Sequence, residues 1–374
     1  MRVNKIVPFS VAIVLVAVLF AGAVAVPVAA QADTMLFHYN AQHTGDYTPV
    51  AGPVLSNGLL KWNFTTGSVV ESSPAVAYGV VYVGGFDHNV YALYANNGTK
   101  IWNYTTGGYI FSSPAYAKGL VYVGSADDNL YALNATTGTL KWKFTTGNFV
   151  RSSPTVANGV VYVGSWDDNL YALNATTGTL KWNFTTGNFV RSSPALANGA
   201  VYVGSADHNL YALNANNGTK IWNYTTGDEV LSSPAVANGV VYVGSNDTNV
   251  YALYANNGTK IWNYTTKNIV GSSPAVANGV VYVGSDDGNL YALNANNGTK
   301  IWNYTTKNIV GSPPAVVTSS PAVANGVVYV GSEDNNVYAI GNAAAATSQG
   351  TPGFEVTLAL VGLVIVAYVV RRRS

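Results

Sequence analysis

Seven aspartates recur at one position of a repeat, and they are the side chains that could most readily do chemistry. Their carboxylates could exchange protons as general acids or bases, or bind Ca²⁺ through oxygen. A tight polar turn, however, is also where Asp hydrogen-bonds the backbone two residues further on. We therefore expect turn-forming carboxylates, no catalytic residue and no cofactor; Ca²⁺ held by adjacent acids, as at Asp127-Asp128 or Asp286-Asp287, is the alternative. The seven are Asp87, Asp127, Asp167, Asp207, Asp247, Asp287 and Asp334.

The amino-acid composition excludes cysteine-based sites and gives no support for a nucleic-acid-binding surface. The 374 residues include no Cys and only four His. Without Cys the chain has no disulfide, no thiolate metal ligand and no thiol nucleophile. The formal net charge of +1 gives no support for nucleic-acid binding.

A repeat of 40 residues fills the middle of the chain. Trp occurs at 62, 102, 142, 182, 222, 262 and 302, and Tyr-Val-Gly recurs with the same period up to Tyr282. The last interval, to Tyr329, is longer by seven residues, which we interpret as a bulged copy of one strand near Ser312. A period near 40 indicates a solenoid or a propeller.

Turn and strand chemistry within one repeat decides between these two folds. Residues 272–306 contain four short β-branched or aromatic runs, separated by turn sequences such as Asn278-Gly279. Four antiparallel strands per repeat form a propeller blade. The strand count predicts an all-β, seven-bladed β-propeller over residues 59–341. We expect the strand at Leu59–Thr65 to complete the blade of Tyr338 and close the ring.

Two loops differ between repeats that are otherwise nearly identical: the turn between the second and third strands, and the connection between blades. In a propeller both emerge on one face, and function usually resides in loops on a rigid scaffold. These loops hold 14 of the 17 acids, so we expect an acidic face. The candidate binding face consists of Glu71, Phe86, His88, Phe111, Asp128, Arg151, Trp166, Asp168, Arg191, His208, Asn246, Asp286 and Glu333.

This face has two interpretations. It is either a solvated rim that resists aggregation, or a binding surface for cations, sugars or a basic partner. In the second case exposed aromatic rings would provide stacking platforms. The rings concerned are Trp166, Phe86, Phe111, Tyr109, Phe149 and Phe189.

The segment Ala132-Leu133-Asn134-Ala135-Thr136-Thr137-Gly138-Thr139-Leu140-Lys141-Trp142 resembles the tryptophan-docking motif of the pyrroloquinoline-quinone (PQQ)-like propeller family. The resemblance extends over all seven repeats. Asn134, Asn174, Tyr94 and Tyr254 stand where the family pattern has Asp. The repeated Trp is then a wedge between neighbouring blades, at Trp62, Trp102, Trp142, Trp182, Trp222, Trp262 and Trp302.

The resemblance implies two functions. Quinoprotein dehydrogenases of the family hold the quinone over the ring centre, commonly against a vicinal disulfide, with Ca²⁺ beside it. The BamB-like outer-membrane assembly lipoprotein is instead a non-enzymatic scaffold. Because this chain lacks Cys and its repeats are not specialised, we predict a non-enzymatic binding or scaffold module, with the PQQ-dependent dehydrogenase as the alternative.

Both ends of the chain are expected to be sorting segments. Residues 1–32 have a basic start, an apolar run and an Ala30-Gln31-Ala32 exit, which is typical of a signal peptide; an uncleaved anchor is the alternative. Residues 33–58 form a lead-in, and residues 342–351 a linker. Residues 352–374 contain Pro352-Gly353-Phe354, an apolar run and three arginines, and resemble the PGF-CTERM sorting signal of archaeal surface proteins.

That tail resemblance implies removal of the tail by an archaeosortase and replacement by a lipid; a short membrane anchor is the alternative. In both cases we expect an exported protein attached to the membrane through its C-terminus, with the propeller outside. The expected partners are a surface protein, a peptide or a glycan. Many Asn-x-Thr sequons, such as Asn134, would then be exposed to glycosylation.

Overall fold

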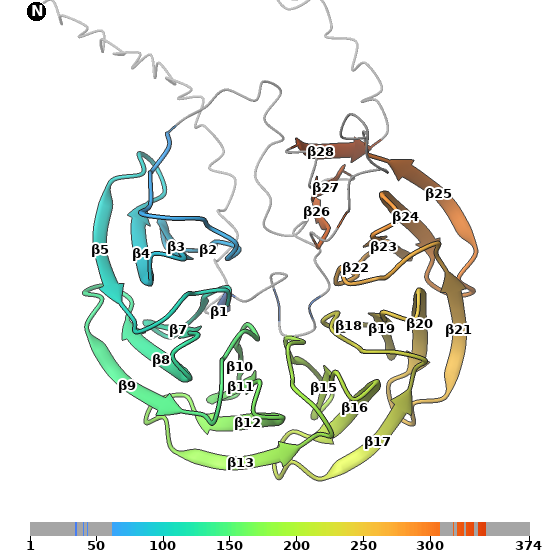
Figure 1. Cartoon of the computed structure of the whole chain (residues 1–374), viewed down its shortest axis with the longest axis horizontal. Helices are drawn as coiled ribbons and strands as arrows, with labels where there is room; N and C mark the ends of the chain where they lie inside the picture. Colours follow the sequence, from blue (N-terminus) through green and yellow to red (C-terminus); the bar gives the residue numbers. More distant parts are fainter. Residues whose placement is uncertain are drawn as a thin grey trace, which may run out of the picture.

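The computed structural model describes residues 34–35, 40, 43, 62–306, 317, 320–324, 327–332 and 336–341. Seven antiparallel sheets stand around a common axis like the blades of a propeller (Figure 1). This confirms the seven-bladed all-β fold. No helix long and apolar enough to span a membrane occurs within the described ranges.

Each blade runs from an inner strand to an outer one in sequence order. Blade 1 contains β2 (Ala75–Ala77), β3 (Val80–Gly84), β4 (Asn89–Tyr94) and β5 (Lys100–Thr105). Blade 2 contains β6 (Ala115–Ala117), β7 (Leu120–Gly124), β8 (Asn129–Asn134) and β9 (Leu140–Thr145). Blade 3 contains β10 (Thr155–Ala157), β11 (Val160–Gly164), β12 (Asn169–Asn174) and β13 (Leu180–Thr185). Blade 4 contains β14 (Ala195–Ala197), β15 (Ala200–Gly204), β16 (Asn209–Asn214) and β17 (Lys220–Thr225).

The remaining blades follow the same plan. Blade 5 contains β18 (Ala235–Ala237), β19 (Val240–Gly244), β20 (Asn249–Tyr254) and β21 (Lys260–Thr265). Blade 6 contains β22 (Ala275–Ala277), β23 (Val280–Gly284), β24 (Asn289–Asn294) and β25 (Lys300–Thr305). Blade 7 has three strands in the described residues: β26 (Ala322–Ala324), β27 (Val327–Ser332) and β28 (Asn336–Gly341).

Two side chains of one blade, a Tyr and a Trp, donate hydrogen bonds to the same backbone carbonyl of the next blade. In blade 4 the Tyr202 hydroxyl and the Trp222 indole N–H both donate to the Ala255 carbonyl of blade 5, each at 3.0 Å. The same pair of bonds links blade 1 to blade 2 at Ala135. Tyr202 and Trp222 are almost fully buried, so the aromatic wedge also supplies much of the apolar contact between blades.

Closure of the ring by residues 59–65 stays a prediction. The Trp62 indole N–H donates to the Ala95 carbonyl of blade 1 at 2.9 Å, and the Phe64 ring lies 5.2 Å from that of Tyr91. These are the contacts that an outer strand makes with the following blade. However, residues 59–61 lie outside the described residues, and residues 62–65 are in no strand, so no pairing with β28 is defined.

The lead-in contributes a strand that the sequence did not indicate. Strand β1 (Thr34–Met35) pairs antiparallel with the inner strand β6, with Thr34 opposite Ala117. Further on, His43 is fully buried and its Nε2 lies 3.0 Å from the Thr155 hydroxyl. Thr155 begins inner strand β10 where other blades have Ala, so this hydroxyl is a contact found in one blade only.

Substituting two glycines of blade 4 distinguishes the cost of a left-handed backbone from the cost of overpacking, because a Cβ would meet a neighbouring side chain at only one of them. Gly199 (φ +76°) has open space where a Cβ would lie, whereas at Gly218 (φ +73°) a Cβ would lie 2.6 Å from Trp182. We expect Gly199→Ala to lower the free energy of unfolding by about 1–2 kcal/mol, for the left-handed backbone alone. Gly218→Ala should cost about 1–3 kcal/mol more, through overpacking against the indole. Denaturant unfolding of both variants measures the difference; equal losses would contradict this account of the blade interface.

Candidate functional site

The two variable loops lie side by side, because backbone hydrogen bonds join them. Trp166 N–H of blade 3 donates to the Phe149 carbonyl of the preceding connection at 2.9 Å. The same kind of bond runs from the Phe86 N–H to the Val69 carbonyl, and from the Asn246 N–H to the Glu229 carbonyl. Both loop sets therefore form one face of the disc.

The recurring aspartates hold the turns of this face. In blade 4 Asp207 Oδ1 accepts the Asn209 N–H at 3.0 Å, and Oδ2 accepts the Gly187 N–H and the Tyr211 hydroxyl at 2.6 Å each. The expected bond to the backbone two residues further on is present at all six aspartates in the described residues. Asp334, the seventh, lies outside them. Because each Asp carries this network, its carboxylate has a structural role.

This network also sets the ionisation of the carboxylate. Burial by itself would raise the pKa of Asp207, but the hydrogen bonds from Tyr211, Gly187 and Asn209 outweigh it and hold the pKa below its usual value. In turn, burial and the bond to Asp207 raise the pKa of Tyr211. The pair thus stays carboxylate and phenol at neutral pH, which is unsuited to proton exchange.

The adjacent variable acids do not gather into a metal site. Asp128, Asp168 and His208 follow the structural aspartate in a left-handed conformation, with φ near +70°. Such a backbone favours Asp, Asn and Gly, which explains part of the residue choice there. No group of three acids or histidines that could hold a metal occurs in the part of the chain that the structure describes.

The aromatic residues pack against one another, and the expected exposure is confirmed for two of the six rings and wrong for the other four. Phe86, Phe111, Trp166 and Phe189 are only half-exposed, while Tyr109 (50%) and Phe149 (39%) are exposed. Phe86 contacts Phe111 at a centroid distance of 4.6 Å, and Trp166 contacts Phe189 at 5.1 Å. The rings bury one another because adjacent connections converge, which single-repeat reasoning did not reveal.

Arg151 joins the two halves of this cluster. Its guanidinium lies 3.7 Å from the centroid of the Phe111 ring and 5.3 Å from that of Trp166. This is cation–π geometry, which holds the side chain in one place. Burial, reinforced by the neighbouring charge of Arg191, lowers the pKa of Arg151, and Glu71 partly offsets this. The Nε of Arg151 is buried without a hydrogen-bond partner.

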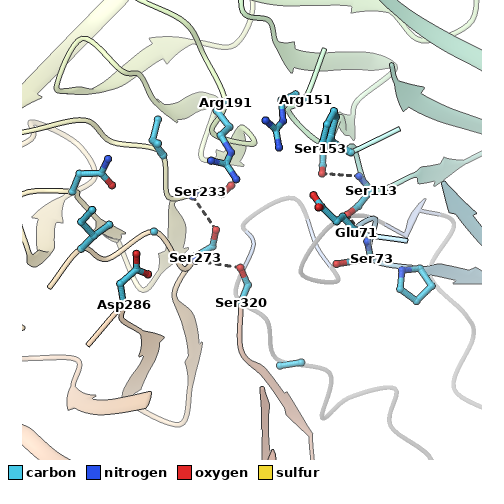
Figure 2. A pocket seen from close by; sticks show the side chains of 17 residues that line it. Glu71, Ser73, Ser113, Arg151, Ser153, Arg191, Ser233, Ser273, Asp286 and Ser320 are labelled. Atoms are coloured by element: carbon cyan, nitrogen blue, oxygen red, sulfur yellow. Dashed lines mark hydrogen bonds between the residues drawn. The ribbon is translucent and has the colours of Figure 1, made fainter. Parts of the chain in front are cut away.

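A cavity of about 730 Å³ opens beside Arg151 at the inner ends of the blades (Figure 2). Six residues of the candidate face line it: Glu71, Phe111, Arg151, Arg191, Asn246 and Asp286. Phe86 and Trp166 lie behind them, through their contacts with Phe111 and Arg151. His88, Asp128, Asp168 and His208 are not among the lining residues, and Glu333 lies outside the described residues.

A ring of serines forms the polar wall of this cavity. The Ser73 N–H donates to the Ser113 hydroxyl, and the same link continues blade by blade to Ser320, at 2.9–3.2 Å. Sequence reasoning missed these serines as site residues. The signal was the Ser-Ser-Pro tripeptide at the start of each repeat, directly after the variable connection.

Comparison with known proteins places this arrangement in a family. A family model described as outer membrane protein assembly factor BamB matches residues 87–229 and 186–351, well over half of the chain. The chain belongs to the BamB family. The BamB-family match covers every blade from the first Asp turn onward, which agrees with the PQQ-like resemblance of the repeats.

Solved structures share the propeller fold at low sequence identity. BamB from Moraxella catarrhalis is 20% identical, with a TM-score of 0.65 over 75% of this chain and 85% of that one. The computationally designed Ika8 protein is 17% identical, with a TM-score of 0.64 over 72% and 83%. The quinohemoprotein alcohol dehydrogenase ADHIIG from Pseudomonas putida HK5 is 17% identical, with a TM-score of 0.67 over 82% and 70%.

Two further findings complete the comparison. No curated protein matches the sequence. The PGF-CTERM motif matches residues 351–373, which indicates export to an archaeal surface and anchoring through the C-terminus.

The PQQ chemistry of some propellers does not fit the residues present. The chain has no Cys for the vicinal disulfide against which the quinone commonly packs in quinoprotein dehydrogenases. Within the described ranges no three carboxylates or histidines converge to hold the accompanying Ca²⁺. The carboxylates that recur around the ring are bound into turns.

Proposed function

We propose that this BamB-family propeller is a non-enzymatic binding or scaffold module on the outer face of the cell membrane. The supporting observation is the placement of the residues that vary between blades. Glu71, Phe111, Arg151 and Arg191 come from four successive blade connections and line one cavity, while the strands beneath them are nearly constant. Variable residues that meet at a cavity on a fixed frame are what a ligand-selecting surface requires.

The variable loops of the face carry acids, and its cavity holds charges of both signs. Asp128, Asp168, Asp228 and Glu229 belong to these loops, whereas Arg151 and Arg191 lie at the cavity together with Glu71 and Asp286. We propose that the acidic loops attract the basic surface of a scaffolded protein, while the cavity provides specificity.

Surface exposure has a direct test. A membrane-impermeant amine reagent should label the lysines of the outer strands, such as Lys181 and Lys220, in intact cells. Both are exposed, so their labelling reports on the side of the membrane that the propeller occupies. Labelling only after lysis would overturn the outward orientation.

The dehydrogenase alternative is tested on the full chain with PQQ and Ca²⁺. We expect no saturable change in the quinone absorbance and no dye-linked oxidation of primary alcohols. Stoichiometric quinone binding with alcohol oxidation would overturn the non-enzymatic assignment.

A further inference from the structure

We propose that the cavity at the axis binds an acidic peptide segment, whose side-chain carboxylates are held by Arg151 and Arg191. This proposal rests on the proposed binding function and names its ligand class. It follows from the donors that the cavity presents, from two arginines that form no ion pair in the described residues, and from its apolar wall.

The serine ring presents donors. Ser113, Ser153, Ser233, Ser273 and Ser320 each line the cavity and accept a backbone N–H from the preceding blade. A hydroxyl that accepts one bond still has its hydrogen to donate. None of these hydrogens has an acceptor among the described residues, so the wall offers a circle of O–H groups to a ligand.

The two guanidiniums add positive charge to these donors. Glu71 and Asp286 also line the cavity, but neither Arg151 nor Arg191 has a carboxylate within 4 Å in the described residues. The Arg151 Nε is buried without a partner, and the two like charges repel one another. A bound carboxylate would relieve both effects, since guanidinium and carboxylate form short, charge-assisted bonds.

Arg151 is already fixed in position for this role. The Phe111 ring beneath its guanidinium and the Trp166 ring beside it restrict its rotamers before a ligand arrives. Binding therefore loses less side-chain entropy than it would with a free arginine. Figure 2 shows Arg151 and Arg191 on the same side of the cavity, with Glu71 nearby.

The other lining residues favour a peptide. Phe111, Leu231, Ile269 and Pro74 line the same cavity as the arginines, so an apolar side chain can lie next to the carboxylate. Peptide carbonyls accept hydrogen bonds and therefore match the serine hydroxyls. A volume of about 730 Å³ holds several residues.

The test is fluorescence anisotropy on the full chain with a labelled acetyl-Gly-Asp-Phe-Asp-Gly-amide. The control peptide replaces both Asp by Asn and keeps the same size and shape. We expect saturable binding of the Asp peptide that weakens with added salt, and binding of the Asn peptide that is weaker by about tenfold or more. Equal binding of the two peptides would overturn the proposal.

Variants of the protein separate the site from the fold. Arg151→Gln and Arg191→Gln should each weaken binding about tenfold, while Lys181→Gln, which removes the same charge from an exposed outer strand, should have no effect. Glu71→Gln should strengthen binding, because it removes a negative charge near Arg151; a gain of affinity cannot result from misfolding. Unchanged binding in both arginine variants contradicts the proposal.

A glucuronate oligosaccharide provides the competing outcome. If it binds through the arginines and the Asp peptide does not, the ligand class is wrong although the binding face stands. If neither ligand binds while the labelled propeller is on the cell surface, the carboxylate site is refuted and the surface location is unaffected.

Discussion

Trp182→Ala is expected to lower the free energy of unfolding by about 3–5 kcal/mol, the range for removing a large buried aromatic side chain. Trp182 is 8% exposed, and its ring lies 5.8 Å from that of Tyr162. Its indole N–H donates to the Ala215 carbonyl of the next blade at 3.0 Å. The substitution removes this bond and leaves a cavity between two blades, which denaturant unfolding measures.

Trp166→Ala is the matched control, since it deletes the same side chain from the loop face. Trp166 is half-exposed, and its indole N–H is buried without a hydrogen-bond partner. It does pack against Phe149, Phe189 and Arg151, so its removal should cost about 1–2 kcal/mol rather than nothing. Equal losses at the two positions would show that the wedge between blades is no more important than the loop cluster.

Acidification below about pH 4 is expected to destabilise the propeller strongly, because several structural aspartates are protonated together. Hydrogen bonds hold the pKa of Asp87, Asp127, Asp207, Asp247 and Asp287 below the usual value, in each case against the effect of burial. Because the pKa of these carboxyl groups is lower in the folded state than in the unfolded state, their ionisation stabilises the fold at a pH above the unfolded-state pKa. This contribution to the free energy of unfolding is lost as the pH falls through the folded-state pKa. Thermal unfolding between pH 2 and 7 measures the effect.

Asp207→Asn tests the origin of this acid sensitivity. The amide cannot accept the Asn209, Gly187 and Tyr211 donors as an anion does, so stability at neutral pH should fall by about 1–3 kcal/mol. The slope of stability against acid pH should become shallower. Asp168→Asn, at the left-handed position that follows the structural aspartate of blade 3, should leave both quantities unchanged. An unchanged slope in Asp207→Asn would contradict the assignment.

The sequence by itself determined the repeat and its local chemistry. The Trp period, the hairpin turns and the aspartate turns are set by residues within about 40 positions of one another, and the hairpin and aspartate turns have the same structure in blades 1 to 6. Local hydrogen bonds such as that from Asn209 N–H to Asp207 depend on backbone geometry two residues away. The motif therefore predicted them directly.

Only the tertiary structure decided which residues form the cavity. The serine ring, the contact of Arg151 with Phe111 and the contact of His43 with Thr155 join residues about 40 or more positions apart. Trp166, which is 15 positions from Arg151, meets Phe149 and Phe189 from two different connections. Such contacts depend on the rotation between blades, and one repeat read alone contains no information about it. All six loop aromatics were therefore predicted as exposed, although packing between connections partly buries four of them: Phe86, Phe111, Trp166 and Phe189.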